Sequence, residues 1–562
     1  MFLKIVKSGQ KIDYVYVVEA YRNERGKVSH RYLFSLGKLE DILSSPGFKR
    51  LAKLALEDEL TEIEKKGKDL LFDNNIVSEG EVLKYGHLIL KRIWDKFKLD
   101  EYFSQIKENT KISYDLSAAI FYMVTKHIME PDSKLGMYES KDHYLNLPSI
   151  NLNHLYRSLD VLSEYKEDLE LYLFEKNRHL FNMEVDVVFY DVTTIYFESK
   201  DEDMLRKFGF SKDGKSNEVQ IVLGLLTDQD GRPIGYDLFE GNTFDGNTLK
   251  PFLKRLKERF NINRIVIVAD KGINSKVNLS EIKFLGYEYI VASRLKNMDK
   301  EILDNVFDPS GYINIRPNNY NYSDNNTDSN NDIFKYKVIE RDNVVTNRDG
   351  ETQTIRERLI VTYSSKRADK DAFDRERLIK KAMKLLEKPS TINGLNKRGG
   401  KKYLTEVGSN HTSWQLDLDM IEKDSKFDGY YCIQTSEDNL EPFQIMEAYH
   451  NLWRIEESFR IMKSTLEVRP VFHYTEKRIK GHFVLCFLAF LLLRTLEIKL
   501  RDKYISITNI KEALNSFTVT KFTLRGEELL LKNKTNAVAK AIRRALNIKD
   551  IKNITPLKEF TI

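Results

Sequence analysis

The stretch EVDVVFYDVTTIYFES, residues 184–199, decides the fold. It is rich in β-branched and aromatic residues, which predicts a long β-strand. Four more strand-like segments follow, two in direct succession and two separated by helical segments: EVQIVLGLLTD (218–228), PIGYDLFEG (233–241), RIVIVAD (264–270) and YEYIVAS (287–293). Hairpin-joined strands that give way to alternating helices and strands predict a mixed α/β sheet covered on both faces.

The α/β pattern of predicted strands and helices resumes further along the chain. The segment GYYCIQTS (429–436) predicts another strand, and a long helix is expected from Pro442 to about Glu467. A very apolar helix is expected from Arg478 to Leu500. Its run FVLCFLAFLLL has 11 residues, whereas a membrane-spanning helix needs about 20. We therefore interpret it as a buried core helix and expect no membrane association.

The interval 296–428 interrupts this α/β pattern. It contains strand-like pieces (334–342 and 357–365), a charged helix around 366–388, and an Asn-rich stretch at 318–332 that is typical of a loop. We interpret the interval as an inserted, mainly β subdomain.

The region before the α/β pattern divides in two. Residues from Ile12 to about Leu39 predict a β-hairpin around a turn at 23–26, and a helical pattern extends from about Leu43 to Leu180. Two of its amphipathic helices could form a helix-turn-helix-like unit that binds DNA. For either helix alone, ordinary packing is the better explanation.

Composition excludes several classes of protein. The chain has 562 residues with 41% hydrophobic residues, so it can bury several cores. Lysine plus arginine number 90 against 85 aspartate plus glutamate, which argues against binding nucleic acid through bulk charge. Cys432 and Cys486 are the only cysteines and lie too far apart for a metal-type spacing. A reducing, intracellular setting follows as an expectation.

Two aspartates lie within or at the end of predicted strands. Asp191 follows VVFY, and Asp270 ends the apolar strand RIVIVAD. Functional sites are built at the carboxyl ends of strands in α/β sheets. A lone aspartate in such a position more often caps the following turn, and the alternative is a carboxylate held rigidly as a metal ligand.

The helix YHNLWRIEESFRIMK (449–463) carries a third acid. Tyr449, Glu456 and Lys463 are seven residues apart, so on a regular helix they form one stripe, which Arg460 joins. Taken alone, the stripe is explained by a solvated face with Glu–Arg pairs. Together with the two strand acids, Glu456 could complete a two-metal site, because Mg²⁺ prefers oxygen ligands and two ions can clamp a phosphate.

These segments resemble the DDE transposases of bacterial insertion sequences, specifically insertion-sequence family four. The best marker is the family's Tyr–x2–Arg–x3–Glu–x6–Lys signature, which Tyr449, Glu456 and Lys463 match. The Arg position is occupied by Leu452, with Arg454 displaced by two residues and Arg460 as a possible substitute. YDVTTIYFES, VADKGINS, FDGYYCIQTS and the long segment 454–494 extend the resemblance over most of the chain.

The resemblance implies a ribonuclease-H-like core interrupted by a mainly β insertion. The expected units are an N-terminal β-hairpin (1–42), a helical DNA-end-binding region (43–180), the first core segment (181–295), the β-rich insertion (296–428), the second core segment with the catalytic helix (429–500), and a tail for DNA or dimer contact (501–562).

The resemblance also implies a site and partners. Asp191, Asp270 and Glu456 would be the catalytic metal ligands, for two Mg²⁺ ions that Mn²⁺ can replace. The DNA-phosphate contacts would come from Tyr449, Lys463, Arg460 and Arg454. Trp414 could stack on an extruded base, although a packed core tryptophan is the commoner case. The expected partners are double-stranded DNA with terminal inverted repeats, target DNA and a second copy of the chain, in the cytoplasm of a bacterium and on its nucleoid when DNA is bound.

Two other interpretations share much of this pattern. A structure-selective DNA nuclease without strand transfer would use the same acids and would lack specific binding to inverted repeats. A non-catalytic DNA-binding protein derived from a transposase usually loses metal acids, and all three are present here. An unrelated α/β hydrolase is disfavoured, because the sequence has neither a G-x-S-x-G motif nor a P-loop.

Overall fold

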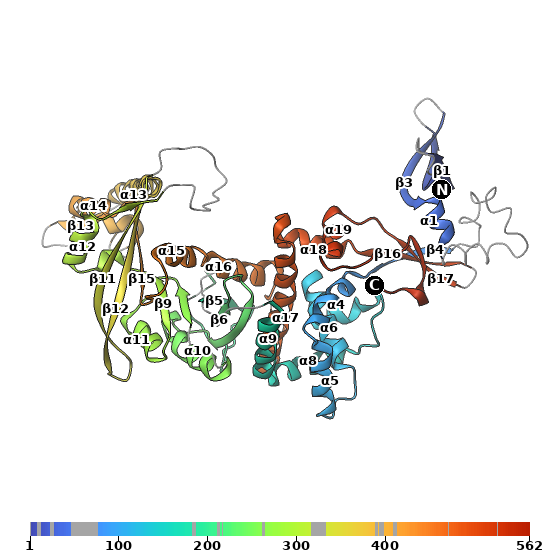
Figure 1. Cartoon of the computed structure of the whole chain (residues 1–562), viewed down its shortest axis with the longest axis horizontal. Helices are drawn as coiled ribbons and strands as arrows, with labels where there is room; N and C mark the ends of the chain where they lie inside the picture. The colour runs from blue at the N-terminus through green and yellow to red at the C-terminus, as the bar shows by residue number, and fades with distance from the viewer. Residues whose placement is uncertain are drawn as a thin grey trace, which may run out of the picture.

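The protein is described from a computed structural model. The residues that the structure describes are 2–7, 13–22, 27–45, 77–181, 187–210, 214–215, 217–260, 265–315, 333–387, 392, 398–407, 413–469, 471–524 and 527–562. The molecule is elongated, with the central sheet towards one end and the N-terminal strands at the other (Figure 1). The Asn-rich stretch 318–332, predicted as a loop, lies outside the described residues.

The central sheet confirms the expected mixed α/β architecture. Its five core strands stand in the order β7-β6-β5-β8-β9. The first three pair antiparallel, whereas β5, β8 and β9 run parallel. These strands are β5 (Val187–Tyr196), β6 (Gln220–Thr227), β7 (Pro233–Glu240), β8 (Val266–Ala269) and β9 (Glu288–Ala292). Every residue of β6 and β8 is buried, as expected for strands covered on both faces.

Helices cover both faces of this sheet. On one face α10 (Asp245–Phe260) and α11 (Lys276–Phe284) bury apolar side chains against the strands. On the other face lie α15 (Pro442–His450), α16 (Trp453–Arg460) and α17 (Glu476–Lys499). Alternate residues of β5 divide between the two cores: Val188 belongs to the first and Phe189 to the second.

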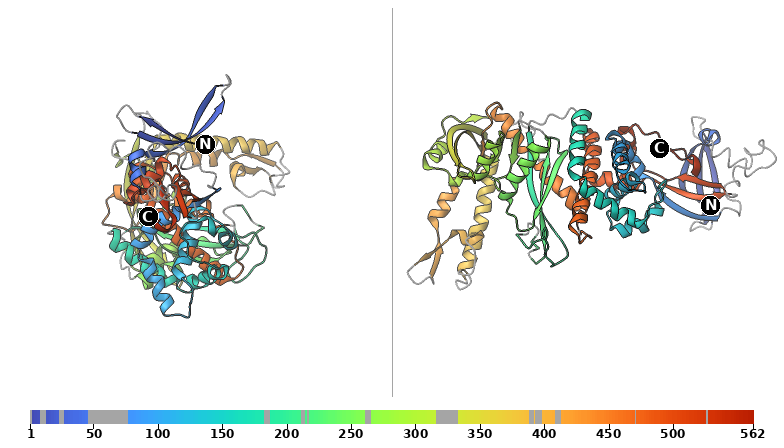
Figure 2. Two further views of the ribbon diagram at one scale, coloured as in Figure 1. Left: turned by 90° about the vertical axis from the view of Figure 1, so that its right-hand side faces the viewer. Right: turned by 90° about the horizontal axis from the view of Figure 1, so that it is seen from below.

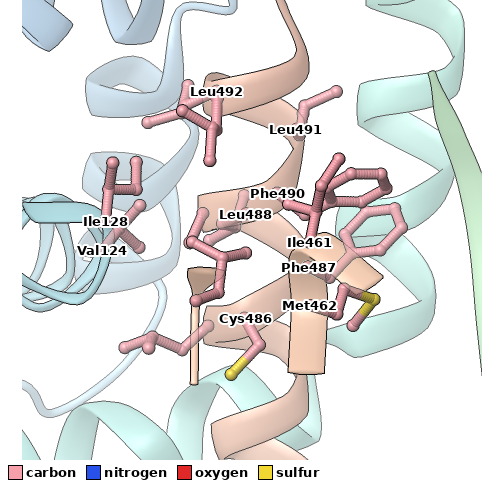
Figure 3. Close-up of a cluster of buried hydrophobic side chains, with 14 of the residues drawn as sticks. Val124, Ile128, Ile461, Met462, Cys486, Phe487, Leu488, Phe490, Leu491 and Leu492 are labelled. Atoms are coloured by element: carbon pink, nitrogen blue, oxygen red, sulfur yellow. The ribbon is translucent and has the colours of Figure 1, made fainter. Parts of the chain in front are cut away.

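Helix α17 is the predicted buried core helix. By length and composition it could cross a membrane, but 89% of its most apolar window is buried inside the protein. It packs against β7 on one side and the helical region on the other. Gly481 allows the closest approach, because a Cβ there would lie 2.0 Å from the backbone oxygen of Leu159. Figure 3 shows Val124 and Ile128 on one side of α17 and Ile461 and Met462 on the other.

The helical region and the C-terminal segment pack together. A four-stranded sheet has the order β18-β17-β16-β4, so a strand before the helices pairs with strands near the end of the chain. The helices are α4 (Gly86–Lys96), α5 (Leu99–Glu108), α6 (Leu116–Met129), α7 (Lys134–Glu139), α8 (Leu152–Glu164) and α9 (Lys166–Phe181). The other elements are β4 (Val77–Lys84), α18 (Ile507–Asn515), β16 (Thr518–Leu524), β17 (Glu527–Lys532), α19 (Ala537–Ala545) and β18 (Ile554–Pro556). The strand β4 interrupts the segment expected to be helical throughout, because its partner is distant in sequence.

The N-terminal strands form a small separate sheet. In the interval expected to be a hairpin, β2 (Asp13–Arg22) pairs antiparallel with β3 (Val28–Lys38). A third strand that the sequence did not predict, β1 (Phe2–Lys7), pairs with β2. The short helix α1 (Leu39–Ser44) follows.

The interval 296–428 extends the central sheet and adds helices to it. The hairpin of β11 (Phe334–Thr346) and β12 (Thr352–Ser364) joins the sheet where β12 pairs with β15 (Tyr430–Thr435). The remaining elements are α12 (Lys300–Phe307), β10 (Ile313–Asn314), α13 (Ser365–Leu386), β13 (Leu404–Val407), β14 (Ser413–Leu416) and α14 (Leu418–Ser425). In the described residues, helices are therefore as prominent as strands in this interval.

Asp424 ties three segments of this interval together. Its carboxylate accepts hydrogen bonds from Lys296 (2.6 Å), from the Tyr403 hydroxyl (2.8 Å) and from Lys402. Burial by itself raises the pKa of Asp424, but these hydrogen bonds outweigh it and lower the pKa to about 2. The carboxylate therefore stabilises the fold above the unfolded pKa of about 4, and this stability is lost as the pH falls towards 2.

We expect Asp424→Asn to lower the free energy of unfolding of this unit by about 2 kcal/mol at pH 7, an order-of-magnitude figure from the pKa difference. The loss should shrink between about pH 5 and pH 2, where the wild type loses the same contribution. Hydrogen exchange of α13 and α14 amides across this pH range measures it. Asp419→Asn, an exposed position on the same helix, should change stability by less than about 0.5 kcal/mol. Equal effects of the two substitutions would contradict the assignment.

Candidate active site

Asp191 and Asp270 lie side by side on neighbouring parallel strands. The strand register pairs Phe189 with Val268, and two more residues along both strands bring Asp191 opposite Asp270. Adjacent strands are about 4.8 Å apart. The two carboxylates, 79 residues apart in sequence, are therefore neighbours on the sheet.

Both carboxylates face the helix-covered side that carries α15 and α16. Side chains alternate along a strand, and Phe189 and Val268, two residues before each aspartate, both pack in the core beneath these helices. Asp191 is half-buried between the buried neighbours Tyr190 and Val192. The strand pattern thus directs two acids towards the helix that carries the third.

The segment from Pro442 to Glu467 is helical as predicted, but it is not one regular helix. It is divided into α15, α16 and a π-helical turn at Ile461–Thr465. Between α15 and α16 the backbone bonds run from residue i to i−3, from Leu452 to Tyr449 (3.1 Å) and from Arg454 to Asn451 (3.0 Å). This geometry winds the chain more tightly than an α-helix, and the π turn winds it more loosely. The seven-residue stripe therefore cannot be inferred from regular helix geometry.

Tyr449 nevertheless lies within the electrostatic influence of two of the predicted acids. Its hydroxyl hydrogen-bonds the Tyr431 hydroxyl of β15 at 2.7 Å. Burial raises the pKa of Tyr449, and Tyr431 and the negative charges of Asp270 and Glu456 raise it further. The phenol therefore stays protonated and can donate a hydrogen bond to an anion between these carboxylates.

Glu456 is exposed on α16, which packs against β5 and β6. Lys463 is half-buried in the π-helical turn that follows. Turns of this kind occur frequently at functional sites. The structure thus places Tyr449, Glu456 and Lys463 along one side of the sheet, on three successive helical segments instead of one.

The three acids do not form a ready-made metal cluster. Among the described residues, which include all three, no group of three or more His, Cys, Asp and Glu side chains could hold a metal ion as arranged. One oxygen of Asp191 accepts from the Val192 amide (2.7 Å), and one of Asp270 from the Gly272 amide (2.6 Å). Carboxylate oxygens are the ligands that Mg²⁺ prefers, so the chemistry of these acids suits a hard divalent cation.

Arg454 and Arg460 belong to a different charge network. The charges that influence the pKa of Arg454 are Arg501, Asp230, Arg494 and Glu457, and burial lowers that pKa most. Arg460 pairs with Glu457 at 3.5 Å, although the stripe had placed it with Glu456. Glu457 is thus the acid that both arginines share, and their role as DNA-phosphate contacts stays a prediction.

Trp414 packs in a small core of the interval 296–428. Its ring contacts the cluster that contains Ala382, Tyr403 and Leu404. The Lys401 ammonium lies 5.3 Å from the ring centre. This matches the packed alternative that the sequence also allowed, and base stacking by Trp414 stays a prediction.

Sequence reasoning missed two residues beside Tyr449. Tyr431 is its hydrogen-bond partner, and the guanidinium of Arg367 lies 4.8 Å from the Tyr431 ring. Both come from segments far from the signature in sequence. FDGYYCIQTS carries Tyr431 and contributes to the family resemblance, whereas no local pattern indicates Arg367.

Comparison with known families gives two matches. Residues 184–492, more than half of the chain, match the family described as Transposase DDE domain. Residues 3–65 match the IS1634 family transposase, N-terminal domain. The second match names a different insertion-sequence group from family four, which the signature spacing had suggested.

Similarity to individual proteins is weaker. No curated protein matches. Among solved structures, the chain is similar to a piggyBac transposase synaptic complex with hairpin DNA, at 8% identity and a TM-score of 0.32, covering 79% of this chain and 82% of that one. It is also similar to a Mos1 transposase paired-end complex with the left transposon end, at 10% identity and a TM-score of 0.15, covering 34% and 65%. From the two family matches, the chain belongs to the DDE transposases of insertion sequences, enzymes that use divalent metal ions to cut and join DNA.

Proposed function

We propose that the protein binds the terminal inverted repeats of its insertion sequence, hydrolyses a DNA strand at each end, and joins the freed 3′-hydroxyl to target DNA. The observation that carries this proposal is the placement of Asp191 and Asp270 side by side on the sheet face beneath α16. Tyr449 lies within the electrostatic reach of both Asp270 and Glu456. A phosphate group bound there would meet acids, a phenol and the helix that carries Lys463.

The core is proposed to be ribonuclease-H-like. Three antiparallel strands followed by two parallel ones, in the order β7-β6-β5-β8-β9, support this assignment. Residues 296–428 separate the second aspartate from Glu456, as the family resemblance implies for its insertion. We further propose that the chain belongs to insertion-sequence family four. The spacing of Tyr449, Glu456 and Lys463 supports this assignment.

The three acids would hold two Mg²⁺ ions, with Mn²⁺ as a substitute. When bound, such ions activate the attacking oxygen and stabilise the leaving oxygen of an in-line displacement. Asp191 and Asp270, fixed by β5 and the end of β8, would supply ligands from a rigid sheet, and Glu456 would approach them from α16. Tyr449 would donate its hydroxyl hydrogen to a phosphate oxygen, and Lys463 would bind a neighbouring phosphate.

Pairing of two DNA ends requires two active sites, so we propose a homodimer in the active complex. The proposed setting is the bacterial cytoplasm, on the nucleoid when DNA is bound. The helical region 43–180 is the proposed DNA-end-binding region, and the C-terminal segment 501–562 packs against it through β4 and β16.

A DNA cleavage and joining assay tests the function. The purified chain is incubated with Mg²⁺, a duplex carrying the repeats that flank its gene, and a supercoiled target plasmid. We expect a strand cut at the repeat boundary and covalent transfer of the 3′-hydroxyl end into the plasmid. Cutting without transfer would indicate a nuclease instead. A scrambled repeat of equal length is the control, and equal cutting of both duplexes would contradict end recognition.

A further inference from the structure

Helix α13 begins beside the candidate active site. The Ser364 hydroxyl caps its first turn by accepting a hydrogen bond from the Arg367 amide (3.2 Å). The guanidinium of Arg367 lies 4.8 Å from the ring of Tyr431, which in turn hydrogen-bonds Tyr449. The start of α13 is therefore two side chains away from Tyr449, whose pKa is raised by the charges of Asp270 and Glu456.

The helix then leads away from the sheet. It has 22 residues, and at 1.5 Å per residue it is about 33 Å long. Figure 2 shows α13, drawn in yellow-tan, projecting from the body of the molecule. Its far end packs with β14 and the turn at Gly399–Tyr403, so the projecting end is held in place.

The two sides of α13 differ in chemistry. One side carries Ala382, which is fully buried, and the apolar residues that pack around it. The opposite side is exposed, and on a helix turning 100° per residue five of the cations beyond its first turn fall within an arc of about 100°. These cations, which we name the α13 basic stripe, are Lys370, Arg377, Lys380, Lys381 and Lys384. Phe373, which is 67% exposed, lies within the same arc.

The charge of this stripe is largely uncompensated. Within the part of the chain that the structure describes, no carboxylate lies within ion-pair distance of Lys380, Lys381 or Lys384. Arg377 pairs with Asp374 at 3.0 Å, at the edge of the stripe. A favourable interaction with the helix C-terminus would account for a cation in the last turn. It does not account for a row that continues for two turns before it.

We propose that the α13 basic stripe binds the phosphate backbone of the DNA whose strand lies in the candidate active site. The segment from Arg377 to Lys384 is 10 to 17 residues beyond Arg367, which corresponds to about 15–25 Å along the helix. At about 3.4 Å per base pair, the contacts fall about 4–8 base pairs from the reacting phosphate. The inference rests on the proposed function, because it places the DNA by the active site.

Salt dependence of DNA binding tests the contact. The probe is a fluorescein-labelled 30-base-pair duplex of random sequence, since phosphate binding needs no particular sequence. Anisotropy is measured between 50 and 300 mM KCl with the full chain. Replacing Lys380, Lys381 and Lys384 together by Gln should reduce the slope of log affinity against log salt by about 2–3, close to 0.9 for each lost phosphate contact.

The matched control changes the same three lysines to Arg, which keeps the charge and should retain the wild-type slope. A wild-type slope in the Gln variant would overturn the proposal. If the wild-type chain self-associates in a salt-dependent way and the Gln variant does not, the stripe binds a second copy of the chain instead of DNA. A wild-type chain that binds neither the random duplex nor the repeat duplex that flanks its gene would refute the proposed function itself.

The position of the contact has its own test. Cys432 and Cys486 are both buried, so Lys384→Cys introduces one accessible thiol for an iron–EDTA probe. On the repeat duplex that flanks the gene, hydroxyl-radical cuts are expected about 4–8 base pairs from the strand-cleavage site, within the reach of the probe. Cuts centred on the cleavage site, or more than about a full helical turn from it, would overturn the placement.

Discussion

Replacing Asp270 by Asn is expected to reduce Mg²⁺-dependent strand cleavage by about 10³-fold or more. Asp270 directly follows β8 beside Asp191 and acts electrostatically on Tyr449. Loss of a charged metal ligand removes several kcal/mol of transition-state stabilisation, and each 1.4 kcal/mol is a factor of about ten in rate. Asp191→Asn and Glu456→Gln should fall to similarly low rates. The measurement is the single-turnover rate on the repeat duplex.

The matched control for this prediction is Glu447→Gln. Glu447 is an exposed carboxylate on α15, two residues before Tyr449. It carries the same charge near the same helix end and has no assigned role, so its rate should stay within about threefold of wild type. A variant of Asp191, Asp270 or Glu456 that cuts at the control rate would remove that residue from the metal site. Binding to the random duplex, measured alongside, separates lost chemistry from lost DNA affinity.

Arg494→Met should produce the largest loss of stability. Arg494 is a 3% exposed guanidinium on α17. It donates hydrogen bonds to Glu457 (3.2 Å) and Ser458 (3.2 Å) on α16 and pairs with Glu497. Its removal leaves the buried Ser458 hydroxyl and two half-buried carboxylates without their partner, which costs about 3 kcal/mol, the lower end of the range for a buried charge pair. Urea-dependent hydrogen exchange of α17 amides measures this free energy of unfolding.

A second arginine provides the comparison. Arg501 is 46% exposed and pairs with Asp230 at 2.8 Å. Because solvent screens an exposed pair, Arg501→Met should cost less than about 1 kcal/mol. Because Glu457 adjoins Glu456, loss of Arg494 should also slow strand cleavage under conditions where the protein remains folded. Equal stability losses in the two variants would show that the buried network does not anchor α16.

Local sequence patterns predicted individual strands and helices whose formation depends on residues close together in the sequence. The apolar run of RIVIVAD indicated a buried strand, and β8 covers Val266–Ala269. The apolar segment 483–493 indicated a core helix, and it lies within α17. These features depend on residues a few positions apart.

Features that depend on distant partners could not be predicted. The strand β4 has no apolar alternation of its own and exists because β16, more than 400 residues later, pairs with it. Arg367 and Tyr431 meet beside Tyr449 only because β12 pairs with β15. The breaks at Asn451 and Ile461 depend on how α15 and α16 pack on the sheet and α17, which the helical period does not reveal.

The sequence by itself determined the class of protein: the strand acids, the Tyr449–Glu456–Lys463 spacing and the α/β pattern indicated a DDE transposase, and the family matches support that class. Only the tertiary structure decided which residues surround the site. It brought Asp191 beside Asp270, joined Glu457 of α16 to Arg494 of α17, and directed the charged helix α13 outward from Tyr431. The physical reason is that strand register and helix packing join residues far apart in sequence, and no local periodicity records that pairing.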